Sequence, residues 1–286
     1  DTAAFCAALA RTNADVFFLN LSNTNMNHET TKILFKALAA NRHLWNIKYL
    51  HLNQCEFNQI DVDLFCKHLN RLSMANKNVI RSLELSGIGF QPNDILNSLV
   101  KFPQPIENLD ISHISMKTKT YDELLKFLKS SKTLKKLNLS YTSIKPEMID
   151  GILKVINANS NIKSINLDLS GNGLGGKKLP LFITSFQKTD LKKWEGLSLD
   201  KNNLTSGNLS NLIPLFKRMP NLKRISLSEN FFQKTKDIQN LLIQLLSVTS
   251  LEEIVIKGNA EKGLGTALYS FIDKLKSNNQ IKILDI

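Results

Sequence analysis

Short stretches of alternating apolar and polar residues recur along the whole chain. In residues 165–169, Ile-Asn-Leu-Asp-Leu, every second side chain is apolar, and an Asn at position 172 precedes a further Leu at position 174. Such alternation is typical of a β-strand with one buried face. Alignment on the pattern L-x-x-L-x-L-x-x-N-x-L finds ten such stretches, with start-to-start intervals of 26 to 33 residues. They start at Val16, Ile47, Ile80, Ile106, Leu134, Ser164, Trp194, Leu222, Leu251 and Ile281.

Amphipathic segments long enough for two or three helical turns separate these predicted strands. In residues 121–129, Leu124 and Leu128 share one helical face, whereas Lys126 and Lys129 lie on the other. A repeat of about 28–30 residues that contains a strand and a helix predicts an α/β leucine-rich-repeat solenoid. We expect a ribonuclease-inhibitor-like horseshoe with parallel strands on its concave face and helices on its convex face.

The whole chain is expected to form a single leucine-rich-repeat domain, residues 1–286, with about ten repeats. Residues 1–15 resemble the tail of a helix from a preceding repeat, and residues 281–286 resemble the start of a further strand. We therefore expect the chain to be a fragment of a longer array.

The ninth position of the pattern differs between the two halves of the chain. It holds Asn172, Asn202, Asn230 and Asn259 in the second half, whose amides can bond to the loop backbone of adjacent repeats. The first half has other residues there, so we expect a continuous asparagine ladder only in the second half, and a structural role for Cys55. The extra apolar Ile165 predicts an early strand start or a bulge. The first-half residues at this position are Thr24, Cys55, Ile88, Ile114 and Thr142.

Composition and charge narrow the functional classes. The chain has no run of eighteen apolar residues, and its three cysteines do not form a disulfide framework, so we expect a cytoplasmic protein. The net charge of +12 raises the possibility of nucleic acid or an acidic membrane as a partner. A nucleic-acid groove needs a continuous basic track, whereas these cations fall on predicted helices and loops. We favour the interpretation that these cations form a solvated surface. Contact with an acidic membrane or an acidic protein is the next alternative, and we expect no nucleic-acid partner. The cations are Lys126, Lys129, Lys132, Lys177, Lys178, Lys192, Lys193, Lys217 and Arg218.

Exposed strand positions are the candidate binding surface. The third, fifth and seventh residues of each pattern are predicted to face outward, and the seventh is mostly Ser, which predicts a small, polar concave face. Adjacent Phe17 and Phe18 cannot both point into the core: either one packs under a neighbouring loop, or both contact a preceding segment of a longer chain. The candidate protein-binding residues are Tyr49, His51, Glu84, Asp110, Tyr141, Asp168 and Asp200.

No pattern in the sequence favours an enzyme. The five histidines fall in different repeats without metal-ligand spacing, and the P-loop, H-E-x-x-H and G-x-S-x-G motifs are missing. His51, Glu84 and Asp110 are expected in one column of the sheet, but no nucleophile accompanies them. We therefore expect a non-enzymatic protein with no catalytic residue, no metal and no cofactor.

Residues 134–175, LKKLNLSYTSIKPEMIDGILKVINANSNIKSINLDLSGNGLG, resemble the repeat region of the CARMIL proteins, which link actin capping protein and myosin I. Those repeats also have an LNLS-x-T-x-L stretch followed by one with an extra apolar pair before LDLS. Residues 227–246, LSENFFQKTKDIQNLLIQLL, resemble a later repeat of that family. The resemblance implies a regulator of actin assembly at the plasma membrane. The family's capping-protein-binding and proline-rich segments are not in this sequence, so it implies here only a rigid spacer and docking surface.

An alternative comes from horseshoes of this repeat type that resemble the activators of the small GTPase Ran. Those proteins act through an exposed arginine near one rim. Arg81 is the only arginine on a predicted strand in the first half of this chain, and the acidic tail usual in that family is missing. A GTP-hydrolysis assay distinguishes this alternative from a scaffold.

Overall fold

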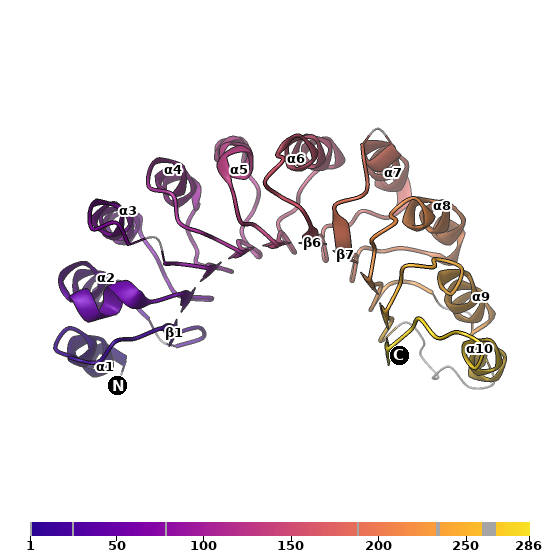
Figure 1. Ribbon diagram of the computed structural model, residues 1–286, viewed down its shortest axis with the longest axis horizontal. Coiled ribbons are helices and arrows are strands. Elements are labelled where there is room, and N and C mark those ends of the chain that lie inside the picture. The colour runs from indigo at the N-terminus through magenta and orange to yellow at the C-terminus, as the bar shows by residue number, and fades with distance from the viewer. Residues whose placement is uncertain (1, 25, 78, 188, 233–234, 259–266) are drawn as a thin grey trace. The chain divides into compact units, whose positions relative to one another are not determined.

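The computed structural model describes residues 2–24, 26–77, 79–187, 189–232, 235–258 and 267–286. Contacts between residues divide the chain into two compact units. The first unit comprises Asp1–Thr142 with Ala158–Ile162, and the second comprises Ser143–Asn157 with Lys163–Ile286. In both units the helices lie on one side of the strands (Figure 1).

The first unit contains strands of three residues that alternate with helices. Its strands pair in parallel and in register, so that Leu19, Leu50, Leu83, Leu109 and Leu137 form one buried column. The strands are β1 (Phe18–Asn20), β2 (Tyr49–His51), β3 (Ser82–Glu84), β4 (Asn108–Asp110) and β5 (Lys136–Asn138). The helices are α1 (Thr2–Leu9), α2 (His28–Ala40), α3 (Gln59–Met74), α4 (Asn93–Lys101) and α5 (Thr118–Ser130), with a 3-10 turn η1 (Arg42–Asn46).

The second unit repeats the same plan. Its strands also pair in parallel, and Leu167, Leu197, Ile225 and Ile254 form the corresponding buried column. The strands are β6 (Ile165–Asp168), β7 (Trp194–Ser198), β8 (Arg224–Ser226), β9 (Glu253–Val255) and β10 (Ile283–Asp285). The helices are α6 (Pro146–Ala158, whose last residue belongs to the first unit), α7 (Leu179–Gln187), α8 (Ser206–Lys217), α9 (Thr235–Leu245) and α10 (Ala267–Leu275), with a 3-10 turn η2 (Gly176–Lys178).

Apolar helix faces complete the cores. In the first unit, α2 buries Leu34, Phe35 and Leu38 against the strands, in agreement with its sequence periodicity. In the second unit, Phe186 packs edge-on against both Phe182 and Trp194, at centroid distances of 5.0 and 5.8 Å. Each buried side chain of this size contributes roughly 1.5–3 kcal/mol. The predicted parallel strand–helix array is confirmed.

An asparagine ladder connects consecutive repeats of the second unit. The Asn202 Oδ1 atom accepts hydrogen bonds from the backbone N–H groups of Asn172 (3.0 Å) and Leu174 (3.1 Å). Asn230 Oδ1 accepts the same pair of bonds one repeat later, from Asn202 (2.9 Å) and Leu204 (3.1 Å). These amides satisfy buried backbone groups, as the ninth-position pattern predicts. Asn259 lies outside the described residues.

The first unit fills the ninth position differently. The Thr24 hydroxyl donates back to the Leu21 carbonyl oxygen at 2.6 Å, and Ile88 and Ile114 are buried. Cys55 is also buried, with its Sγ atom 3.4 Å from the same Leu21 oxygen. Burial raises the pKa of the Cys55 thiol to about 12. Its predicted structural role is confirmed, because a buried thiol without thiolate character is unreactive.

The predicted irregularity at Ile165 is confirmed as well. Ile165 pairs with Trp194 but Asn166 pairs with Gly196, so that Glu195 of β7 is the additional residue. A Cβ atom on Gly196 would lie 2.1 Å from the Asn166 Oδ1 atom, which excludes any larger residue there without rearrangement. The extra residue therefore belongs to β7, although the sequence signal for it lies in β6.

Candidate protein-binding surface

We call the side of each sheet that its helices do not cover the open face. It carries the third and fifth residues of each repeat pattern, which are the first and last residues of each three-residue strand, because the fourth points into the core. In the first unit, the fifth residues Asn20, His51, Glu84, Asp110 and Asn138 form one column through the strand register, which confirms their predicted alignment. We call this set the polar column.

Neighbouring strands hold the polar column in place. The His51 Nε2 atom lies 3.3 Å from Glu84 Oε1, and the amide of Asn53 donates to Glu84 Oε2 at 2.8 Å. The Asn138 amide donates to Asp110 Oδ2 at 2.8 Å. The predicted site residues His51, Glu84 and Asp110 are therefore half-buried and have fixed positions. The carboxylates of Glu84 and Asp110 keep lone pairs for a partner, because each oxygen can accept more than one hydrogen bond.

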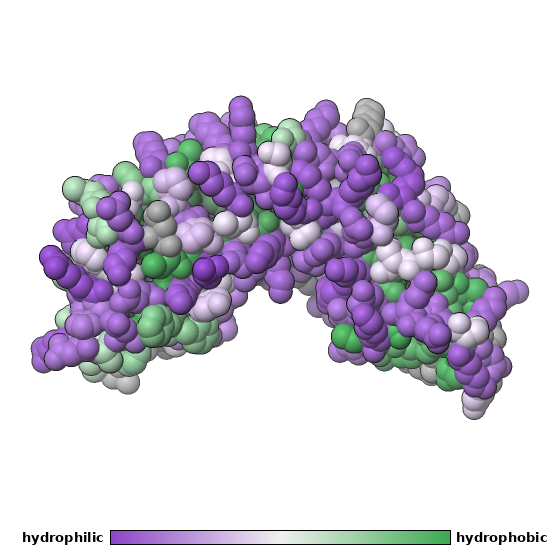
Figure 2. All heavy atoms as spheres, viewed as in Figure 1, coloured by the Kyte–Doolittle hydropathy of each residue, from purple (hydrophilic) through white to green (hydrophobic). Residues whose placement is uncertain are grey.

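Aromatic side chains gather beside one end of the polar column. Phe17, Phe18 and Tyr49 are 51%, 55% and 40% exposed, and Figure 2 shows apolar surface over the region of β1. The Phe18 ring lies 6.2 Å from Tyr49 and 5.1 Å from His51, and the Lys48 ammonium lies 5.3 Å from the Phe17 ring centre. Neither phenylalanine packs under a neighbouring loop, as the first alternative expected, because both side chains are more than half exposed.

The seventh-position serines do not form an exposed surface. Ser86, Ser112, Ser140, Ser170 and Ser228 are all buried, which corrects the prediction of a small polar face. Their hydroxyls bond between adjacent repeats instead, as the Ser112 Oγ donates to Ser86 Oγ at 2.8 Å. A strand position that alternation assigns to the outside is thus covered by the neighbouring repeats.

Two predicted acidic residues lie in the second unit. The Asp168 Oδ1 atom accepts the backbone N–H of Ser170 at 2.9 Å. Asp200 Oδ1 accepts the Ser226 hydroxyl at 2.6 Å and the Ser228 N–H at 2.7 Å. Burial raises the pKa of Asp200, although these two hydrogen bonds act in the opposite direction. Both residues are half-buried, and they belong to a different unit from the other predicted residues.

Arg224 is an open-face residue that the sequence reasoning missed. Its Nε atom lies 2.9 Å from the Glu253 carboxylate, and its NH1 group donates to the Ser198 hydroxyl at 3.1 Å. Both Arg224 and Glu253 occupy the third position of the repeat pattern, where the pattern itself predicts exposure. That position was the signal that could have identified them.

The eighth residue of the pattern adopts a left-handed backbone conformation. Tyr141 and His113 have φ angles of 54° and 56°. Tyr141 therefore lies in the turn after β5, not on a strand as predicted. The rings of His113 and Tyr141 stack with centroids 4.4 Å apart and planes 16° from parallel, and both side chains are exposed. The other residues in this conformation at the same position are Asn23, Gln54, Gly87, Gly171, Lys201, Glu229 and Gly258.

The cationic residues of the helices and loops are mostly exposed, as predicted. Lys126 is exposed, but its ammonium lies 2.8 Å from Glu123 on the same helix. Lys193 differs, because its ammonium donates to the carbonyls of Ile156 (2.9 Å) and Asn157 (3.0 Å) at the end of α6. Lys193 is thus a helix cap and not part of a free basic surface.

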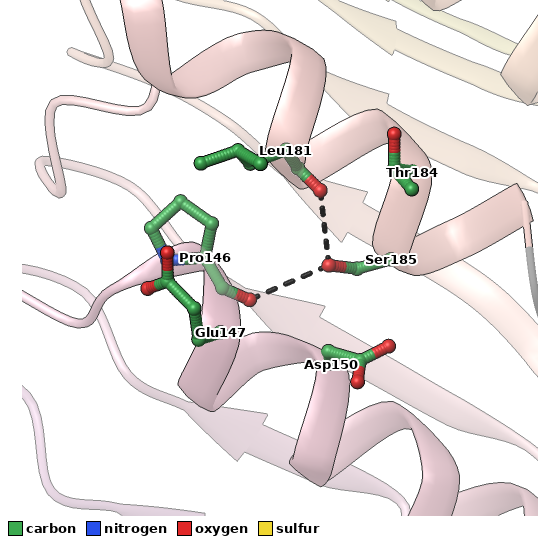
Figure 3. Close-up of a pocket in the computed structure, with 6 residues that line it drawn as sticks. All are labelled: Pro146, Glu147, Asp150, Leu181, Thr184 and Ser185. Carbon is green, nitrogen blue, oxygen red and sulfur yellow. Dashed lines mark hydrogen bonds between the residues drawn. The ribbon is translucent and has the colours of Figure 1, made fainter.

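A pocket of about 190 Å³ lies between α6 and α7 of the second unit (Figure 3). The Ser185 hydroxyl lies within hydrogen-bond distance of the Leu181 (3.0 Å) and Pro146 (3.4 Å) carbonyl oxygens, and the Thr184 hydroxyl donates to Pro180 O at 2.8 Å. Neither hydroxyl can act as a nucleophile without losing these bonds. The pocket is lined by Pro146, Glu147, Asp150, Leu181, Thr184 and Ser185.

The described residues contain no group of three or more His, Cys, Asp or Glu side chains that could hold a metal ion. Within the same described part of the chain, no helix has the length and apolar character needed to cross a membrane.

His68 on α3 is buried, and desolvation lowers its pKa to about 4, although a hydrogen bond with the Leu38 backbone acts in the opposite direction.

Solved structures similar to this chain include the leucine-rich-repeat-containing protein LegL7 from Legionella pneumophila. That match has a TM-score of 0.62 and 21% sequence identity, and covers 98% of this chain and 88% of LegL7. A chain of the yeast Rad7–Elc1 complex matches with a TM-score of 0.49 and 14% identity over 97% of this chain and 76% of that one. The tropomodulin C-terminal domain of Caenorhabditis elegans matches with a TM-score of 0.34 and 16% sequence identity, and the match covers 58% of this chain and 81% of that one.

No protein-family model matches the chain, and no curated protein matches it either. The LegL7 similarity and the parallel strand–helix repeats define the class of fold. This chain has the α/β leucine-rich-repeat fold.

Proposed function

We propose that this chain is a non-enzymatic protein-interaction scaffold whose partner binds the open face of the first unit. One observation carries the proposal: contacts between neighbouring strands already fix the polar column and the adjacent aromatic rings, and the helices of the unit lie on the other side of its strands (Figure 1). Binding to side chains that are fixed beforehand loses less conformational entropy. Aromatic residues are also enriched at protein interfaces.

More specifically, we propose that the chain is part of a CARMIL-like regulator of actin filament assembly that links capping protein and myosin I at the membrane. The sequence resemblance of residues 134–175 and 227–246 supports this identity. The irregular pairing of β6 with β7 is consistent with the extra apolar pair in that resemblance. A cytoplasmic, cortical location and contact of exposed lysines, such as Lys129 and Lys132, with acidic lipids belong to the same proposal.

Affinity capture from a cytosolic extract tests both levels of this proposal. The wild type is compared with a Glu84→Lys, Asp110→Lys variant on the open face, and with a Lys126→Glu, Lys129→Glu control on α5. We expect the open-face variant to lose at least tenfold of the specifically captured protein, whereas the control keeps it. Capping protein or myosin I among the captured proteins would support the CARMIL-like identity. Equal capture by the open-face variant would contradict the scaffold proposal.

No observation favours the Ran-activator alternative. Arg81, the residue it would use, is ion-paired with Glu107. Glu107 also binds Lys135 at 2.8 Å, so a nucleotide-directed role for Arg81 would require these contacts to break. Stimulation of GTP hydrolysis by the purified chain would revive the alternative.

A further inference from the structure

His113 and Tyr141 occupy a backbone conformation that their side chains disfavour. At the eighth position of the pattern, the left-handed turn holds Gly or Asn in four repeats and a flexible polar residue in three others, although any L-residue with a large side chain meets steric resistance there. Two aromatic residues nevertheless follow β4 and β5 in consecutive repeats. Strained residues of this kind cluster at binding sites, where the surrounding structure holds them in place.

The two rings form an exposed platform. Their centroids lie 4.4 Å apart with nearly parallel planes, and Tyr141 remains 38% exposed. A stacked pair of this type stabilises itself, and it also leaves aromatic surface available for a further planar group. The platform is therefore suited to a ligand that stacks.

A carboxylate is anchored beside this platform. Asp110 Oδ1 accepts the backbone N–H of Ser112, the residue directly before His113, at 2.8 Å. Asn138 Oδ1 accepts the N–H of Ser140, directly before Tyr141, at 2.9 Å, and its amide donates to Asp110 Oδ2 at 2.8 Å. These bonds tie the negative charge of Asp110 to the turns that carry both rings.

We propose that His113, Tyr141 and Asp110 bind the guanidinium group of an arginine side chain on a partner protein. A guanidinium is planar and cationic, so it stacks on aromatic rings and also pairs with a carboxylate through two parallel N–H bonds. A lysine ammonium can form an ion pair with the carboxylate, but it has no planar group to stack and no two parallel N–H bonds to donate. The base of a nucleic acid could also stack, but the carboxylates of Glu84 and Asp110 would repel the phosphate groups of the same strand. The inference rests on the scaffold proposal and specifies the partner's chemistry.

Titration of the whole chain with short peptides tests this assignment. The probe is acetyl-Gly-Ser-Arg-Ser-Gly-amide, and matched peptides have lysine or citrulline in place of arginine. NMR of the aromatic side chains should show shifts of the His113 and Tyr141 ring signals, with at least tenfold tighter binding of the arginine peptide than of either matched peptide. Equal binding of the citrulline or lysine peptide, or tighter binding of an oligo-dT strand, would overturn the proposal.

Variants separate recognition from folding. Tyr141→Gly removes the ring and also relieves the left-handed strain, so we expect at least a tenfold loss of arginine-peptide affinity with an unchanged or higher melting temperature. Gln54→Gly, at the same turn position, is the matched control and should keep full affinity. Tyr141→Leu keeps apolar bulk but removes the aromatic ring, so it should also lose affinity for the arginine peptide. Asp110→Asn should lose this affinity while the His113 and Tyr141 rings remain stacked.

Two results would show that Tyr141 has only a structural role: full affinity in Tyr141→Gly and Tyr141→Leu, or loss of affinity only together with unfolding in both. The scaffold proposal is tested separately by the capture experiment. If capture depends on Glu84 and Asp110 but the arginine peptide does not bind the platform, the inference fails and the scaffold proposal stands.

Discussion

The two units have the same strand–helix plan but connect their repeats in different ways. The second unit uses buried amides that bond from one repeat to the next, whereas the first unit fills the corresponding position with Thr24, Cys55 and Ile88. Buried hydrogen bonds depend strongly on geometry, and apolar contacts much less so. The comparison shows that one repeat pattern can be stabilised by a specific polar ladder or by ordinary packing. The aromatic turn residues occur in the unit that lacks the ladder.

The largest expected effect is loss of the ladder at its centre. Asn202→Ala removes the bonds that Asn202 supplies to the buried N–H groups of Asn172 and Leu174, whereas the Leu169 carbonyl still accepts the Asn172 amide at 2.9 Å. At roughly 1–3 kcal/mol for each buried unsatisfied group, we expect a loss of about 4 kcal/mol in unfolding free energy. Urea unfolding followed by circular dichroism measures it.

The first unit provides the matched change. Ile88→Val, at the same pattern position, should cost only about 1 kcal/mol, because it removes one methyl group from a packed core. If the two substitutions cost the same, the distinction between a polar ladder and apolar packing is wrong.

Acidification should destabilise the first unit through His68. Its folded-state pKa of about 4 lies below the usual 6.5, so the folded state resists protonation that the unfolded chain accepts. The stability contribution is therefore complete above pH 6.5 and is lost as the pH falls toward 4, by about 3 kcal/mol in total. Hydrogen exchange of α3 amides at pH 7 and pH 4.5 would measure this loss.

His68→Leu is the control for that experiment, because it keeps an apolar side chain at the buried position. The variant should lose most of the pH dependence between 6.5 and 4. An unchanged pH dependence would assign the acid sensitivity to other groups.

Asp200 in the second unit should behave with the opposite sign and with the smallest effect. Because its folded-state pKa is raised above 3.8, protonation favours folding, and this contribution is lost as the pH rises through the folded-state value. Asp200→Asn should therefore raise stability slightly at pH 7 and not at pH 3. Thermal melting at both pH values checks this, and a variant less stable at pH 7 would show that the hydrogen bonds from Ser226 and Ser228 outweigh the burial of the charge.

Much of the fold follows from local periodicity, and so does part of the site. Alternation identified the strands, and the shared fifth position of the pattern placed His51, Glu84 and Asp110 in one column. Burial of the serines was not predictable in the same way, since it depends on how closely the next repeat lies. The turn after β5 was missed because Tyr141 is an unusual residue at a left-handed position. An aromatic side chain where most repeats have a small or polar residue was the available signal for both Tyr141 and His113.

Hydroxyl-radical footprinting of this chain, with and without its captured partner bound, tests the central claim most directly. The side chains of Tyr49, Tyr141 and Phe18 on and beside the open face are exposed and readily oxidised, and Met74 at the end of α3 is 79% exposed on the helical side. We predict that the partner protects the three aromatic residues at least threefold and leaves Met74 unchanged. Protection of Met74 with no protection of the aromatic residues would contradict binding at the open face of the first unit.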